Sequence, residues 1–166
     1  MTNAYKLFIL RHGIAAERGG FTHDSERTLT SEGEEEMERV AKGMQKLGLE
    51  FDLILSSPYV RARQTAEIVA DRFKMKVKFT DNLIPSAEAK KLLREIEADY
   101  GSARNILLAS HDPFVSAFMS IMVAGSPAMV VDFKKGGLCK VVCHKLTMGM
   151  GQLKWLLTPR QLALMA

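Results

Sequence analysis

Leu7-Phe8-Ile9-Leu10-Arg11-His12-Gly13 joins a short apolar run to a cation, an imidazole and a glycine. The apolar run predicts a buried strand, and open α/β sheets bind ligands at the carboxyl ends of such strands. We therefore expect Arg11 and His12 together at that edge, with Gly13 allowing a sharp bend. Because a guanidinium grips phosphoryl oxygens and an imidazole can attack phosphorus, the pair suits phosphoryl chemistry.

A second imidazole occupies a matching position later in the chain. Asn105–Ser110 is typical of another buried strand, and His111 follows it directly. Asp112 is expected to cap the next helix and Pro113 to begin it, which predicts His111 at a helix amino end that favours anions. One histidine would more often pack near the surface, but two at matching strand ends favour a shared site.

An arginine-bearing helix follows a third expected strand, Phe51–Leu55. Ser57 is expected as the N-cap and Pro58 as the first helical residue, which places Arg61 about one turn into the helix. Arg61 flanks the apolar stripe near the strand end, whereas Arg63 shares the solvent face with an acidic residue four positions later. Arg61 is therefore the predicted phosphate ligand.

These motifs together resemble the histidine phosphatase superfamily, which also contains the cofactor-dependent phosphoglycerate mutases. The resemblance rests on Arg11-His12-Gly13, on Ser-Pro-x-x-Arg-Ala-x-x-Thr ending at Thr65, and on Ser110-His111. It runs from about Tyr5 to Leu162. The features that resemble the SixA-type phosphohistidine phosphatases in particular are the short chain, Arg27-Thr28-Leu29-Thr30 with Gly33, and Trp155-Leu156-Leu157-Thr158-Pro159.

The resemblance implies roles for individual residues. His12 would be the nucleophile and become transiently phosphorylated, while Arg11, Arg61 and His111 would hold the phosphoryl oxygens. Arg27 would lie at the rim of the site, where it could contact substrate or simply anchor its loop. No cofactor or metal is expected, because the sequence has no closely spaced His/Cys set and no Gly-rich loop ending in Lys-Ser or Lys-Thr.

One departure from the superfamily bears on the substrate. Many members carry a glutamate proton donor in the stretch that corresponds to Asp81–Ser86, where this chain has Pro85. Glu88, Asp24 and Glu17 could reach the site, but none fits the pattern. A phosphomonoester needs its departing alkoxide protonated, whereas an imidazole leaving group, with a pKa of about 6.5, is easily protonated near neutrality. The missing acid therefore favours P–N over P–O cleavage.

The wider pattern predicts an α/β fold. Alternating strands and helices favour a three-layer α/β/α sandwich, mostly parallel with an antiparallel edge strand, and the resemblance implies a phosphoglycerate mutase-like form. We expect residues 1–166 to form a single histidine phosphatase domain. Thr30-Ser31 with Glu34 resembles a capping box for a helix that ends near Leu47. The later elements are expected at Val77–Phe79, Glu88–Tyr100, Pro113–Ala124, Met129–Phe133, Leu138–His144 and Leu153–Leu157.

Composition limits the partners and the compartment. The net charge of +4 is small and scattered, so nucleic-acid binding is not expected. No segment is long and apolar enough to span a membrane, and the N-terminus does not resemble a signal peptide. Cys139 and Cys143 would lie roughly 13 Å apart in a strand, too far for a disulfide. We therefore expect a cytoplasmic protein, and the sequence makes no prediction of its oligomeric state.

Three functional hypotheses remain at this point. The first is a metal-independent phosphohistidine phosphatase that cleaves the P–N bond of a phosphorylated protein, or of a small phosphoramidate, through a phosphohistidine intermediate. The second is a small-molecule phosphomonoesterase or mutase that uses the same nucleophile. The third is a non-catalytic phosphate-binding interaction module, which would have no need of His12.

Overall fold

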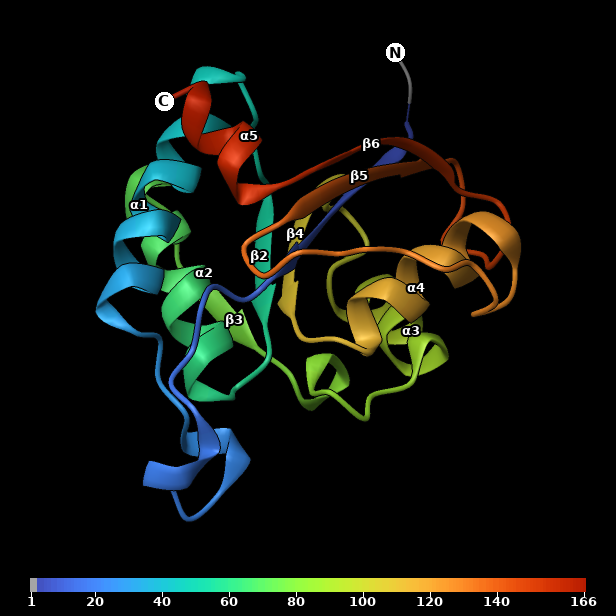
Figure 1. Ribbon diagram of the computed structural model, residues 1–166. Helices are drawn as coiled ribbons and strands as arrows, with labels where there is room; N and C mark the ends of the chain where they lie inside the picture. Colours follow the sequence, from blue (N-terminus) through green and yellow to red (C-terminus); the bar gives the residue numbers. More distant parts are fainter. Residues whose placement is uncertain (1–2) are drawn as a thin grey trace.

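A six-stranded sheet in the order β3-β2-β4-β1-β5-β6 forms the centre of the structure, a computed structural model that describes residues 3–166 (Figure 1). Strands β1 to β4 are parallel, whereas β5 is antiparallel to both β1 and β6. The predicted α/β fold with a mostly parallel sheet and an antiparallel edge is confirmed. The strands are β1 (Tyr5–Arg11), β2 (Leu53–Ser56), β3 (Val77–Phe79), β4 (Asn105–Ser110), β5 (Leu138–Cys143) and β6 (Gln152–Leu157).

Helices cover both faces of the sheet and complete the three predicted layers. One face carries α1 (Ser31–Lys46), α2 (Val60–Phe73) and α5 (Pro159–Leu164), and the other carries α3 (Ala89–Asp99) and α4 (Phe114–Ala124) (Figure 1). Short 3-10 helices lie in the connections: η1 (Arg18–Gly20), η2 (Asp24–Glu26) and η3 (Asp81–Leu83). None of the helices within residues 3–166 combines the length and the apolar character that a bilayer crossing requires.

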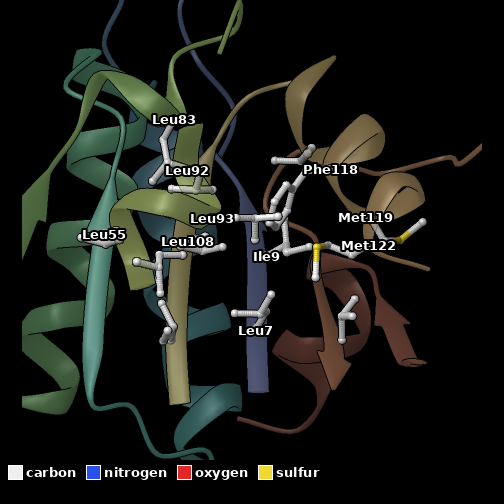
Figure 2. Close-up of a cluster of buried hydrophobic side chains, with 14 of the residues drawn as sticks. Leu7, Ile9, Leu55, Leu83, Leu92, Leu93, Leu108, Phe118, Met119 and Met122 are labelled. Atoms are coloured by element: carbon white, nitrogen blue, oxygen red, sulfur yellow. The ribbon is translucent and has the colours of Figure 1, made fainter. Parts of the chain in front are cut away.

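Alternation along β1 explains how one strand supports two cores. Leu7 and Ile9 belong to the cluster under α3 and α4, whereas Phe8 and Leu10 belong to the cluster under α1 and α2. Figure 2 shows Leu7 and Ile9 in the first of these clusters, with Phe118 of α4 near Ile9. Burying each such side chain contributes about 1.5–3 kcal/mol, so the two cores fix β1 and the residues that follow it.

The helix α1 approaches the segment after β1 at a glycine. A Cβ atom on Gly33 would lie only 2.1 Å from the carbonyl oxygen of Ile14. The helix is capped by Thr30, whose side chain accepts a hydrogen bond from the Gly33 amide at 3.0 Å, and Thr30 itself donates through its amide to Ile14. Thr30, one of the two residues predicted to cap the helix, is thus the cap, but its amide donates to a carbonyl and not to the Glu34 side chain of a capping box.

Two sequence predictions about the elements are wrong. Met129–Phe133 is not a strand: Val130 is fully exposed, and the Met129 amide donates to the Ser120 hydroxyl at 3.0 Å instead of to a neighbouring strand. The helices α2 and α4 also begin later than expected, at Val60 and Phe114, because Pro58 and Pro113 precede them and do not lie within them.

Candidate active site

Three strand ends bring the candidate residues to one edge of the sheet. β1 and β4 are parallel neighbours with Arg11 opposite Ser110, so His12 and His111 leave the sheet side by side. The backbone amide of His12 donates to the carbonyl of Ser110 at 3.0 Å. On the other side of β4, the chain leaves β2 at Ser57 and enters α2. The sheet topology therefore assembles residues that are up to 100 positions apart in sequence (from Arg11 to His111).

The imidazole of His12 is held in one tautomer. Its Nδ1 lies 2.7 Å from the Gly13 carbonyl, which can only accept, so Nδ1 carries the proton and Nε2 carries the lone pair. Arg61 Nε donates to that Nε2 at 3.2 Å. Burial, together with the charges of Arg61, Arg11 and Lys135, lowers the pKa of His12 from 6.5 to about 3. His12 is therefore a neutral base at neutral pH.

Arg61 is a buried cation with defined partners. Its side chain is 4% exposed, and besides His12 it donates to the Asp24 backbone carbonyl at 2.7 Å and to the Asp24 carboxylate at 2.9 Å. A guanidinium has five N–H donors, and these three contacts leave two of them for a ligand. Asp24 thus fixes the orientation of Arg61 and compensates its charge, without using all of its donors.

Thr65, the last residue of the arginine motif, joins α2 to the segment after β1. Its hydroxyl donates to the Arg61 carbonyl at 2.7 Å and accepts from the Gly13 amide at 3.1 Å. Both bonds are buried, where an unsatisfied group would cost about 1–3 kcal/mol. The motif residues Arg61 and Thr65 therefore hold the first turn of α2 against the backbone that carries His12.

The second imidazole, His111, is also buried and neutral. Its ring centroid lies 5.1 Å from that of His12 and 5.2 Å from that of Tyr59. Burial and the nearby His12 and Arg61 lower the pKa of His111 from 6.5 to about 2. The Ser57 hydroxyl accepts from the Tyr59 amide at 3.2 Å, so its own proton is available to His111 Nε2 at 2.8 Å. When Ser57 donates in this contact, the proton of His111 lies on Nδ1.

Arg11 lies at the same edge but points to other partners. Its guanidinium donates to the Phe133 carbonyl at 2.5 Å and forms an ion pair with Asp112 at 3.1 Å. It is nevertheless close enough to lower the pKa of both imidazoles. Within residues 3–166, the buried atoms without a hydrogen-bond partner include Arg11 Nε and His111 Nδ1.

The structure thus brings the four predicted residues together in two ways. His12, His111 and Arg61 lie in direct or near contact, while Arg11 joins them through its charge and through Asp112, the residue next to His111. We call these four residues the His–Arg cluster. All of them are buried or half-buried.

Two further arginines, Arg27 and Arg63, lie outside the His–Arg cluster. Arg27 donates to the Ala16 carbonyl at 2.8 Å and to the Asp24 carboxylate at 3.0 Å, so it anchors its own loop. Arg63 lies on the exposed side of α2 and faces Glu67 at 3.9 Å, as the helical spacing predicts. Arg27 and Arg61 both donate to the Asp24 carboxylate, so Arg27 is connected to the His–Arg cluster through Asp24.

Of the three carboxyl groups that the sequence considered, Asp24 is the one that bonds to the His–Arg cluster. Glu88 is exposed and pairs with Lys91 at 3.0 Å, and Glu17 is exposed. Partial burial raises the pKa of Asp24, but hydrogen bonds from two arginines outweigh that effect and hold it below 3.8. Asp24 is therefore an anion that orients cations, and not the proton donor that the sequence left as an alternative.

Sequence reasoning missed two supporting residues. Ser57 was expected as a helix cap, yet its hydroxyl contacts His111, because α2 begins three residues later. Asp112 was expected as a cap and does bond to Ser116 of α4 at 2.6 Å, but its other oxygen holds Arg11. Both residues lie just after a strand, and that position was the signal in the sequence that could have placed them at the site. Between residues 3 and 166, no group of three or more His, Cys, Asp or Glu side chains could hold a metal ion.

Comparison with known proteins places the chain in a family. The model of the histidine phosphatase superfamily (branch 1) matches residues 7–84, and an uncharacterized protein of Picosynechococcus sp. is 33% identical over 80% of this chain and 82% of its own length. The chain belongs to the histidine phosphatase superfamily, whose members are generally phosphatases.

Within that superfamily the chain is similar to SixA. Phosphohistidine phosphatase SixA of Escherichia coli is 28% identical over 93% of this chain and 94% of SixA. The solved structure of the protein histidine phosphatase SixA complexed with tungstate matches with a TM-score of 0.82 and 27% identity, over 95% of this chain and 99% of that one. The resemblance to this superfamily and to its SixA-type members is confirmed.

Proposed function

We propose that the protein is a phosphohistidine phosphatase that hydrolyses the P–N bond of a phosphorylated protein histidine. One observation carries the proposal: a buried, neutral His12 presents the lone pair of Nε2 beside Arg61 and His111. A neutral imidazole is the form that can attack phosphorus, and the adjacent cation neutralises charge on the phosphoryl oxygens.

The reaction proceeds in two displacements. In the first, the hydrogen bond from Arg61 Nε to His12 Nε2 opens and the freed lone pair of Nε2 forms a bond to phosphorus. The P–N bond of the substrate breaks, and the leaving imidazole takes the electron pair and a proton from solvent. In the second, water attacks phosphorus, the bond to Nε2 breaks, and its electron pair returns to His12. The water proton leaves with phosphate or solvent. Such transfers require mainly positioning and charge neutralisation.

The rest of the His–Arg cluster binds the phosphoryl oxygens. Arg61 offers its two remaining N–H donors, and His111 offers Nδ1–H in the tautomer in which Ser57 donates to Nε2. Arg11 offers Nε, which has no partner among the described residues. Tungstate is a tetrahedral oxyanion like phosphate, so its presence in the similar SixA structure supports an oxyanion site in this chain.

The leaving group decides between the two enzymatic hypotheses. Pro85 stands where many superfamily members have a glutamate acid, and Asp24 is ionised. An alkoxide leaving group needs such an acid, whereas an imidazole with a pKa of about 6.5 is protonated readily near neutrality. The absence of a suitable acid among these residues supports P–N cleavage. We further propose that residues 1–166 act as one domain in the cytoplasm without a metal ion.

The test is a comparison of three substrates in the presence of EDTA. Phosphoramidate and phosphohistidine should be hydrolysed with a higher kcat/KM than p-nitrophenyl phosphate. A preference for the aryl ester would favour the phosphomonoesterase hypothesis, and a requirement for added metal would contradict metal independence. Binding of phosphate without turnover of any of the three would identify a phosphate-binding module.

A further inference from the structure

A basic turn is fastened to the backbone of the two residues at the end of β1. In Lys134-Lys135-Gly136-Gly137, the Gly136 amide donates to the carbonyls of Arg11 and His12 at 3.0 and 2.9 Å. In return, the Arg11 amide donates to Gly137 at 3.1 Å. Gly136 has a φ of +75°, in the left-handed region that favours glycine. The two lysines are therefore carried on a turn whose position is fixed relative to His12.

The same turn forms one side of a cavity of about 590 Å³ next to the His–Arg cluster. Arg11 belongs to both the cluster and the cavity wall. Four cationic and two acidic side chains line the cavity, an excess of two positive charges, with the remaining wall made by Ile14, Thr158 and Pro159. The charged residues are Arg11, Lys134, Lys135, Arg160, Glu36 and Asp132.

Local pairing shows which of these charges are available. Asp132 is paired with Lys134 at 2.9 Å, whereas Lys135 and Arg160 are exposed and form no ion pair among the described residues. The charge of Lys135 contributes to the low pKa of His12, so it acts on the nucleophile as well as on the cavity. Burial raises the pKa of Glu36.

We propose that this cavity receives a carboxylate side chain located beside the phosphohistidine of a protein substrate. The inference rests on the proposed function and adds a selection for acidic flanking sequence. The occupant is assigned to a protein because Lys135 and Arg160 are exposed, and exposed charges select and accelerate association with a complementary surface. Sites for small molecules instead use enclosed, convergent polar groups.

Two phosphohistidine peptides test the proposal, identical except for glutamate or glutamine next to the phosphohistidine. The unaltered protein should cleave the glutamate peptide with a kcat/KM about two- to thirtyfold higher, the range for two exposed ion pairs. The ratio should fall to near one in the double variant Lys135→Ala/Arg160→Ala, and at high salt. It should be retained in Lys76→Ala/Lys90→Ala, which removes two exposed lysines outside the cavity.

Each other outcome is decisive. The inference would be overturned by a ratio near one in the unaltered protein, or by an unchanged ratio in the Lys135→Ala/Arg160→Ala variant. In either case the proposed function would still stand if the protein hydrolysed phosphoramidate. The unaltered protein could instead prefer free phosphohistidine to its carboxyl-blocked amide. If Lys135→Ala/Arg160→Ala removed only that preference, the cavity would bind a small molecule, and the assignment of a protein substrate to it would be wrong. Failure to hydrolyse phosphoramidate at all would overturn the proposed function, and the inference with it.

Discussion

The burial of two neutral imidazoles predicts a specific loss of stability in mild acid. His12 and His111 have pKa values of about 3 and about 2 in the folded protein, against 6.5 in the unfolded chain. Between these values the unfolded state binds more protons than the folded state, so stability falls as pH decreases below 6.5. Above that pH the contribution is complete, since both states are then neutral.

The size of this stability loss follows from the difference between the folded and unfolded pKa values of the two histidines. At pH 5 an unfolded histidine is mostly protonated, which stabilises the unfolded state by about 2 kcal/mol per residue relative to pH 7. The two histidines together should therefore lower the free energy of unfolding by about 4 kcal/mol between pH 7 and pH 5. Asp24 does not add to this loss, because its pKa lies below 3.8 and its ion pairs are lost only in stronger acid.

Urea denaturation at pH 7 and pH 5 measures this loss directly. His12→Asn and His111→Asn should each reduce the pH-dependent loss by about 2 kcal/mol, whatever they do to stability at pH 7. His144→Asn, at an exposed position, should retain the full loss. If all four proteins lose the same free energy between the two pH values, the two imidazoles are not buried in the neutral form and the reasoning fails.

Three further substitutions test the contacts that support the site. Asp24→Asn should lower the free energy of unfolding by about 1–3 kcal/mol and reduce kcat/KM for phosphoramidate at least tenfold, because the buried guanidinium of Arg61 loses its ion-pair partner. Urea denaturation and steady-state assays measure the two effects. The control Glu17→Gln, in the same exposed loop, should leave both quantities unchanged. Ser57→Ala should reduce kcat roughly tenfold without unfolding the protein, and an unchanged kcat would show that the tautomer of the second imidazole does not depend on it. Gly33→Ala should lower the melting temperature clearly, because the added Cβ would lie 2.1 Å from a carbonyl oxygen. Gly19→Ala should not lower it, because no atom lies within 4 Å of the added Cβ. Equal melting temperatures for the two variants would contradict the close approach of Gly33 to that oxygen.

Much of the architecture could be predicted from short apolar runs. Asn105–Ser110 and Val77–Phe79 are strands with the predicted bounds. Asn105–Ser110 is a central, buried strand and reads as a continuous apolar segment, whereas Val77–Phe79 lies at an edge of the sheet and is partly exposed. Met129–Phe133 has a similar composition, but its backbone bonds to side chains such as Ser120 and Arg11. Composition does not distinguish these two situations, since the difference lies in tertiary partners.

The missed helix α5 did carry a local signal. Thr158 and Gln161 form a capping box with bonds of 3.1 and 2.9 Å, and Pro159 is the first helical residue. Leu162 is fully buried, and a Cβ on Gly43 of α1 would lie 2.0 Å from its carbonyl oxygen. The six-residue helix was too short to show a periodic pattern, and so its capping residues were the only indication.

The convergence of the candidate site was predictable for a topological reason. His12 and His111 follow parallel strands, and such strands end at one edge of a sheet whatever their separation in sequence. The contacts of Asp24 were not predictable, because they depend on how an irregular loop with two short 3-10 helices folds over the site. Loop conformation leaves no period in the sequence, whereas strands and helices do.

The proposed function depends on His12 Nε2 carrying the phosphoryl group during turnover. The most direct measurement is to mix the protein with phosphoramidate, quench it in alkali, where phosphohistidine is stable, and locate the modified residue by mass spectrometry. We predict a phosphoryl group on His12 that is acid-labile and absent from His12→Asn. Turnover of phosphoramidate with no adduct, or with the adduct on another residue, would contradict it.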